Sequence, residues 1–248
     1  MELTVLGNLS PYPTADGGCS SYLIQHDDHN ILVDVGSGTL GNLEEVIPCH
    51  ELDAVIISHL HLDHFLDLFP LHYVIMIAIQ NGLRQEPLKV YLPFSASEEL
   101  DFIRAKVGDE FHLQELRADS KLQFGELDFS FHPTTHSKEC LGVKVATADF
   151  SLGYTADTSL DKSLIEFFKG TNLLLAEASL LERDANRRSA GHMTVTDAVE
   201  FGTKAEVEKL LLTHLSSVYD QPDIKNEIPE TDLEVELTTV LETYKING

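Results

Sequence analysis

Four side chains that can bind metal lie close together in one short segment, in the order His59, His61, Asp63 and His64. The apolar residues 54–57 before them predict a buried strand, and residues 65–69 after them predict the start of a helix. Imidazole and carboxylate groups together suit zinc, manganese or iron. We therefore expect a metal-binding loop at the carboxyl end of a strand, where ligands collect in layered α/β folds. The alternative is a polar surface loop rich in histidine.

Three more candidates follow predicted strands further along the chain. His136 comes after a strand that ends at Pro133, Asp157 after the strand 152–155, and His214 after the strand 210–213. This repeated placement predicts that ligands from several strand ends meet at one site. The other histidines outside the chemical motifs lack this placement and are expected to be structural: His26, His29, His50, His72, His112 and His132.

The elements that must position these residues are strands in the first half and mixed strands and helices later. Strands are predicted at 2–7, 20–25, 30–35, 89–92, 111–116, 122–124, 127–133, 143–146, 152–155, 173–176 and 210–213. Helices are predicted at 40–46, from Asp67 onward, and at 95–107, 160–169, 194–204 and 231–244, the last being amphipathic. This order predicts two sheets packed face to face with helices outside. The apolar helix 71–79 is either core or the interface of a homodimer.

The 248 residues show no repeat or convincing linker, so we expect a single domain over 1–248. The first residues lack a basic region followed by an apolar one, which argues against a signal peptide. The longest apolar run, near 73–79, is too short to span a bilayer. We therefore predict a soluble, cytoplasmic protein without a membrane partner.

Charge and cysteine content exclude several classes of protein. The net charge of −24, from 17 basic and 41 acidic residues, disfavours a broad nucleic-acid-binding surface. The three cysteines, Cys19, Cys49 and Cys140, form no Cys-x-x-Cys pair, so neither a disulfide framework nor a cysteine-rich zinc site is expected.

The pattern His59-x-His61-x-Asp63-His64, followed by His136, Asp157 and His214, resembles the metallo-β-lactamase superfamily over nearly the whole chain. The resemblance implies an α/β fold, a four-layer αββα sandwich, with a dinuclear metal centre. By that resemblance one metal is held by His59, His61 and His136, the second by Asp63, His64 and His214, and Asp157 bridges them. Zinc is the default pair of divalent ions, with manganese or iron as alternatives. No cysteine occupies a ligand position, unlike in the antibiotic-hydrolysing lactamases that use one.

Two further motifs are similar to ribonuclease Z-like proteins: Leu175–Ser179, which contains Glu177, and Gly191–Thr194, which contains His192. The resemblance implies that Glu177 orients His192 and that His192 protonates the leaving oxygen. Asp63 is counted with them as a catalytic residue. The alternatives are a helix-capping role for His192 and a structural carboxylate at Glu177.

The chain departs from tRNA-processing enzymes of that group. They carry a long arm between the ligands that match His136 and Asp157, whereas residues 137–156 here have room for one hairpin. With the acidic charge, this makes tRNA an unlikely substrate. Arg183, Arg187 and Arg188 form either a phosphate-docking loop or a solvated one.

Two carboxylates near the motif are candidates for indirect roles. Asp34 is expected to accept an N–H from a ligand imidazole. Asp67 either does the same or lies at a helix start.

The leading hypothesis is a metal-dependent phosphodiesterase that acts on small or cyclic nucleotides or short oligonucleotides through a hydroxide held between two metals. Two other readings remain open. One is a lactonase or other acyl or thioester hydrolase, because the same ligands serve carbonyl chemistry. The other is a non-catalytic metal-containing binding or sensor protein.

Overall fold

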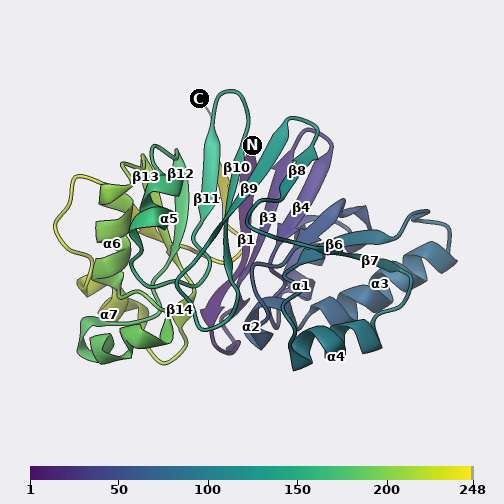
Figure 1. The fold of residues 1–248 in the computed structure, drawn as a ribbon, viewed down its shortest axis with the longest axis horizontal. Coiled ribbons are helices and arrows are strands. Elements are labelled where there is room, and N and C mark those ends of the chain that lie inside the picture. Colours follow the sequence, from purple (N-terminus) through teal and green to yellow (C-terminus); the bar gives the residue numbers. More distant parts are fainter. Residues whose placement is uncertain (247–248) are drawn as a thin grey trace.

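Two β-sheets pack face to face with helices on both outer surfaces in a computed structural model of the chain (Figure 1). The structure describes residues 1–246. The predicted αββα sandwich is confirmed. Strand β1, near the start of the chain, pairs with β16, near its end, so both terminal regions belong to the same sheet.

The first sheet has the strand order β14-β1-β3-β4-β5-β6-β7, and β2 and β16 also pair with β1. Strands β1, β3 and β4 are antiparallel neighbours, whereas β4 to β7 are parallel. Parallel neighbours end at the same sheet edge, which brings the loops after β4 and β5 together. The strands are β1 (Glu2–Ser10), β2 (Gly18–Cys19), β3 (Ser21–His26), β4 (His29–Val33), β5 (Ala54–Ile56), β6 (Leu88–Leu92), β7 (Phe111–Glu115), β14 (Leu215–Ser216) and β16 (Thr243–Lys245).

The second sheet has the order β15-β13-β12-β11-β10-β9-β8. Strands β8 to β11 form an antiparallel meander, and β11, β12, β13 and β15 run parallel. The carboxyl ends of β9, β11, β12 and β13 therefore lie at one edge. The strands are β8 (Lys121–Phe124), β9 (Leu127–Pro133), β10 (Leu141–Ala146), β11 (Ser151–Tyr154), β12 (Leu173–Glu177), β13 (Lys209–Thr213) and β15 (Glu234–Leu237).

The main core lies between the sheets and follows the predicted alternation of apolar residues. Leu127, Phe129 and Phe131 of β9 are buried there, while the residues between them are not. Tyr22 and Tyr154 meet across the two sheets with ring centroids 4.8 Å apart. These contacts fix how the sheets face each other.

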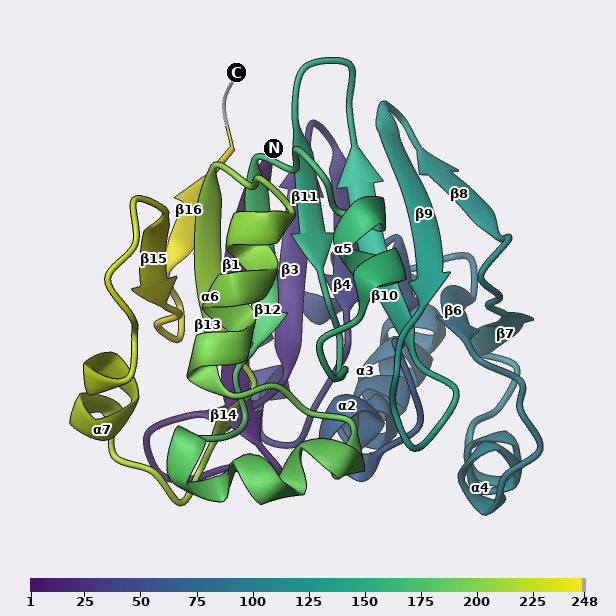
Figure 2. The same ribbon diagram turned by 60° about the vertical axis from the view of Figure 1, so that its left-hand side comes forward.

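Helices cover the outer faces (Figures 1 and 2). The first sheet is covered by α1 (Leu40–Val46), η1 (Cys49–Glu51), α2 (Leu62–Phe65), α3 (Leu68–Gln80) and α4 (Glu98–Lys106). The second is flanked by α5 (Lys162–Phe167), η2 (Glu182–Ala190), α6 (Val195–Lys204) and α7 (Gln221–Asn226).

The predicted amphipathic helix 231–244 is wrong. The segment forms two short strands instead: β15 adds to the edge of β13, and β16 crosses to pair with β1. Apolar residues in this segment fit helical spacing, but strand partners from distant parts of the chain decide its structure.

Residues Leu62–Gln80 form a helical segment with a mean hydropathy of 1.4, long and apolar enough by length and composition to cross a membrane. This is weak evidence for a membrane span, because 44% of the segment is buried within the protein. It also contains Asp63 and His64, whose side chains point into the site described next.

Candidate metal centre

All seven predicted metal-binding side chains meet at the edge where the strands end. They come from the loop after β5 with α2, and from the loops after β9, β11 and β13. His59, His64, Asp157 and His214 are almost completely buried. His214 and Ala156, the residue before Asp157, have positive φ angles of 52°. Such left-handed backbone is costly for residues other than glycine, and it is retained where surrounding structure holds it in place.

The donor atoms form two neighbouring clusters. In the first, His61 Nδ1 lies 3.0 Å from His59 Nε2 and 3.1 Å from His136 Nε2. In the second, His214 Nε2 lies 3.2 Å from His64 Nε2 and 3.4 Å from Asp63 Oδ2. Ligands that converge in this way on a small volume are typical of a metal site.

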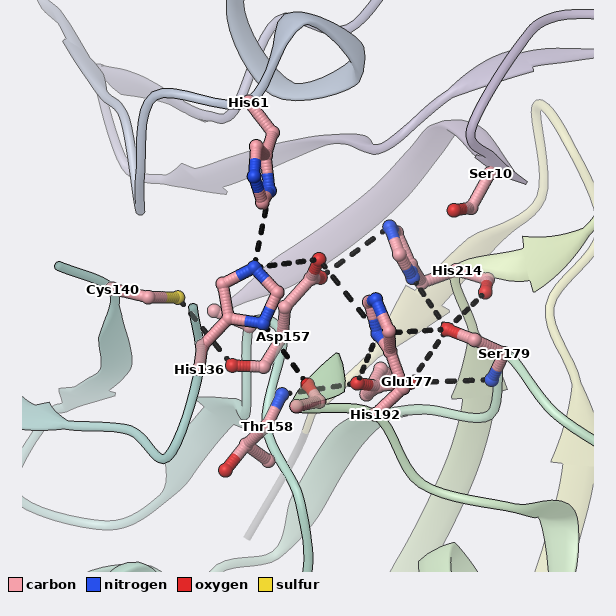
Figure 3. A network of polar contacts seen from close by, with 12 residues as sticks. Ser10, His61, His136, Cys140, Asp157, Thr158, Glu177, Ser179, His192 and His214 are labelled. Atoms are coloured by element: carbon pink, nitrogen blue, oxygen red, sulfur yellow. Dashed lines mark hydrogen bonds and ion pairs between the residues drawn. The ribbon is translucent and has the colours of Figure 1, made fainter. Parts of the chain in front are cut away.

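Asp157 lies between the two clusters (Figure 3). Its Oδ2 is 3.5 Å from His59 Nε2, and its Oδ1 is 3.5 Å from His64 Nε2 and 3.4 Å from His214 Nε2. Oδ1 is buried without a hydrogen-bond partner. A buried carboxylate oxygen without a partner is costly, so its position fits a bound cation.

Hydrogen bonds behind the imidazoles determine which nitrogen faces inward. His64 Nδ1 lies 2.8 Å from Asp34 Oδ2, and His136 Nδ1 lies 3.0 Å from the Gly191 carbonyl oxygen. Both partners only accept, so each Nδ1 carries a proton and each Nε2 is the nitrogen that faces the cluster.

Serine hydroxyls support the other two deeply buried rings. Ser58 donates to Asp34, which leaves its oxygen to accept from His59 Nδ1 at 3.1 Å. Ser179 donates to Glu177 at 2.6 Å and accepts from His214 Nδ1 at 2.8 Å. The lone pairs of both Nε2 atoms therefore also face the clusters.

Asp34 has the role that the sequence predicts. Besides His64, it accepts hydrogen bonds from the backbone and hydroxyl of Ser58 and from the hydroxyl of Tyr154 at 3.1 Å. Asp67 is a carboxylate at a helix start, which was its alternative role. It lies directly before α3, and its side chain accepts from the backbone N–H groups of Thr39 and Leu40 at the start of α1 rather than supporting an imidazole.

The electrostatics of the site favour a bound cation. Burial and the neighbouring histidines lower the pKa of His59, and burial lowers the pKa of His61 to about 4, so both rings are neutral near pH 7. Burial opposes ionisation of Asp157, but the nearby His214 and His64 hold its pKa well below the ordinary value. Burial lowers the pKa of His64, but Asp157 and Asp34 outweigh it and raise that pKa well above the ordinary value, so a metal ion would displace a proton from this ring. Neutral imidazoles and an ionised carboxylate are the forms that bind metal.

Glu177 and His192 form the predicted pair beside the clusters. His192 Nδ1 lies 2.9 Å from Glu177 Oε1, which also accepts from the backbone N–H of Thr158. Burial lowers the pKa of His192, but the Glu177 carboxylate outweighs it and raises that pKa to about 9. His192 also lies close enough to Asp157 and His214 to share a metal ion with them. Its Nδ1, however, is hydrogen-bonded to Glu177.

Two residues in this region have roles that sequence reasoning missed. Ser179 connects the Glu177–His192 pair to His214 (Figure 3). Its position two residues after Glu177 was the available signal, because alternate residues of an extended segment share a side. Gly191 accepts from His136 and has φ +90°, and a Cβ there would lie 2.8 Å from the His136 ring.

The arginines before His192 are mostly engaged elsewhere. Arg183 pairs with Asp223 at 3.1 Å, and Arg188 pairs with Asp197 at 2.6 Å and with Glu182 at 2.9 Å. Within residues 1–246, Arg187 alone of the three has no ion pair. A phosphate-docking loop built on all three is therefore not supported.

The fold and the site define a class of metal-dependent hydrolase, and comparison with known proteins agrees. Residues 29–215 match the family described as beta-lactamase superfamily domain, and the chain belongs to this superfamily. Its relatives and structural neighbours place it with the ribonuclease Z-like members.

Three relatives illustrate this placement. "Probable metallo-hydrolase YhfI" of Bacillus subtilis is 32% identical, with 87% of each chain covered. The YhfI crystal structure superposes with a TM-score of 0.91 over 98% of both chains. Ribonuclease Z of Clostridium acetobutylicum is 23% identical, with 90% of each chain covered. The short form of human tRNase Z has the same fold, with a TM-score of 0.80 at 20% identity over the full length of both chains.

Proposed function

We propose that this metallo-hydrolase is a phosphodiesterase that acts on small or cyclic nucleotides or short oligonucleotides. The observation that carries the proposal is the Glu177–His192 pair beside the two donor clusters. A phosphodiester of an alcohol has a poor alkoxide leaving group that benefits from a positioned acid beside the metals, whereas a thioester releases a thiolate that needs none. A lactone also releases an alkoxide, so the substrate panel below has to separate it from a phosphodiester.

The clusters would hold two divalent ions, with zinc as the default. His59, His61 and His136 would bind one, Asp63, His64 and His214 the other, and Asp157 both. When bound, such ions activate water as a nucleophile and neutralise the phosphoryl oxygens. The relatives named ribonuclease Z support this choice of reaction.

His192 would supply the proton to the leaving oxygen. The Glu177 carboxylate accepts a hydrogen bond from His192 Nδ1. The pKa of His192, raised to about 9, keeps the ring protonated near pH 7. The Nε2 proton is then available for transfer, and Glu177 keeps the ring oriented during that step.

A small substrate fits the rest of the molecule better than tRNA. Only the short β10–β11 hairpin lies between His136 and Asp157, and Arg183 and Arg188 are engaged in ion pairs. The net charge of −24 also opposes binding of a long polyanion.

The test combines a substrate panel with one substitution. Cyclic nucleotides and aryl phosphodiesters should be hydrolysed, whereas lactones and thioesters should not. His192→Ala should lower turnover of a cyclic nucleotide, whose leaving group is an alkoxide, by about 100- to 10,000-fold while bound metal is unchanged. Turnover of an aryl phosphodiester, which has a better leaving group, should fall less. His132→Ala is a matched control, since His132 lies outside both clusters: its Nδ1 contacts the Pro133 carbonyl and its ring packs on Phe167.

Three outcomes would contradict the proposal. Full turnover of a cyclic nucleotide by His192→Ala would exclude the acid role. Hydrolysis of carbonyl substrates alone would favour the acyl hydrolase. Nucleotide binding without turnover by the metal-loaded protein would favour a sensor.

A further inference from the structure

A separate group of metal-competent side chains lies at the opposite end of the sandwich. His26 and Asp27 are at the turn between β3 and β4 in the first sheet, and Glu126 is at the turn between β8 and β9 in the second (Figure 1). Strands β4 and β9 run from these turns to the candidate metal centre. Their five and seven residues separate the two places by roughly 17 to 23 Å.

The three side chains surround a gap that no hydrogen bond closes. His26 Nε2 is buried and has no hydrogen-bond partner. It lies 3.9 Å from Asp27 Oδ2 and 3.8 Å from Glu126 Oε2, beyond hydrogen-bond range. A zinc-class ion with bonds of about 2.0–2.2 Å holds its ligand atoms about 3–3.5 Å apart. Small movements of the two carboxylate ends would therefore place all three atoms around one ion.

Neighbouring groups hold the two turns in this relation. The His26 ring lies edge-on to Phe150, with centroids 6.1 Å apart. The His29 ring packs so closely on Gly125 that a Cβ there would lie 2.7 Å from His29 Cδ2. Gly125 also has φ +57°, which favours glycine. The backbone of Glu126 is thereby fixed beside His26.

The charge around the gap favours a cation. The Asp27 and Glu126 side chains are 72% and 76% exposed, whereas His26 is 15% exposed, so an ion from solvent meets the two carboxylates first and reaches His26 Nε2 as their ends move. Over the part of the chain that the structure describes, neither carboxylate has a lysine or arginine within ion-pair distance.

We propose that His26, Asp27 and Glu126 bind a divalent transition-metal ion of the zinc class. One imidazole nitrogen and two carboxylate oxygens are suitable ligands for such an ion, and water completes its coordination. Because the ligands come from both sheets, the bound ion links the β3–β4 turn to the β8–β9 turn. The proposal does not depend on the function assigned to the other site.

Zinc stoichiometry tests the site. Metal-free full-length protein is dialysed against Zn²⁺ and its zinc measured, and the wild type should bind one equivalent more than His26→Ala. His26→Ala should keep full hydrolase activity, because the candidate metal centre is untouched. His112→Ala, which removes an exposed histidine outside the cluster, should bind as much zinc as the wild type. Equal stoichiometry in the wild type and His26→Ala would overturn the site.

Amide hydrogen exchange tests the bridge between the sheets. Zinc should slow exchange in residues 26–29 and 125–127 together, and Glu126→Gln should lose both effects and the extra equivalent. Glu126 lies on an exposed turn, and circular dichroism verifies that the variant is folded. Protection limited to residues 26–29, or unchanged zinc binding by Glu126→Gln, would show that no ion links the sheets.

Discussion

Ser179 joins the two functional parts of the site through a single hydroxyl group. Its proton goes to Glu177, and its oxygen accepts from His214. The same side chain therefore helps to hold the Glu177–His192 pair and selects the nitrogen that His214 presents to the cluster. Residue types and positions at strand ends predicted the donor atoms. The two-residue spacing places Ser179 on the same side as Glu177, but nothing in the sequence indicates its contact with His214.

Replacement of Ser179 tests the link. Ser179→Ala should weaken zinc binding by about 10- to 100-fold, as loss of such supporting hydrogen bonds does in other metal sites. Ser179→Thr keeps the hydroxyl and should restore most of the affinity. Competition with a chelator measures the effect, and Ser189→Ala, an exposed serine, is the control. Wild-type zinc affinity in Ser179→Ala would exclude a positioning role.

At the scale of elements, short helices and loops depend on individual caps to hold the ligands. Asp161 caps α5 by accepting from the backbone of Ser163 and Leu164, and it also accepts from the Thr135 hydroxyl at 2.6 Å. Thr135 precedes His136, so the same carboxylate anchors a ligand loop. The helix itself was predicted over 160–169 and is observed over 162–167, and the capping residue decides where it begins.

Asp161→Ala should lower the free energy of unfolding by about 1 kcal/mol near neutral pH. Burial raises the pKa of Asp161, but hydrogen bonds from Ser163 and Thr135 outweigh it and lower that pKa from 3.8 to about 2. The charged form is thus favoured in the folded state. The charged carboxylate therefore stabilises the folded state fully above pH 3.8, and this stabilisation is lost as the pH falls toward 2.

Urea unfolding at several pH values measures this effect. The difference between the wild type and Asp161→Ala should shrink as the pH falls below 3.8. Asp161→Asn keeps a capping oxygen and should retain most of the stability without the pH-dependent part. A constant difference over the whole pH range would be inconsistent with the charged cap.

For the whole molecule, the acidic charge should slow the approach of anionic substrates. The kcat/KM for a nucleotide should rise between about 10 and 150 mM salt, because the screening length falls from about 30 Å to about 8 Å. A neutral ester of similar size is the control and should show little change. A decrease of kcat/KM with salt would instead point to a local basic docking site, for which Arg187, without an ion pair in residues 1–246, is the candidate.

One face of the helix predicted at 71–79 belongs to the core, which was one of the two alternatives considered for it. Leu71 and Ile75 are buried in the core, whereas Tyr73 and Ile77 are 61% and 51% exposed. The exposed face keeps a homodimer as a proposal, and light scattering of the purified protein would measure it. The cytoplasmic location also remains a prediction.

The sequence by itself determined the superfamily, the layered fold and the predicted ligands, because these depend on residue types, strand-end positions and local alternation. Tertiary structure decided the rest. The segment after residue 230 became strands because β13 and β1 offer edges to pair with. Asp34 reaches Tyr154, and His26 faces Glu126, because the two sheets pack in one register. Such contacts join segments far apart in the chain, and neither segment alone carries a signal for the other.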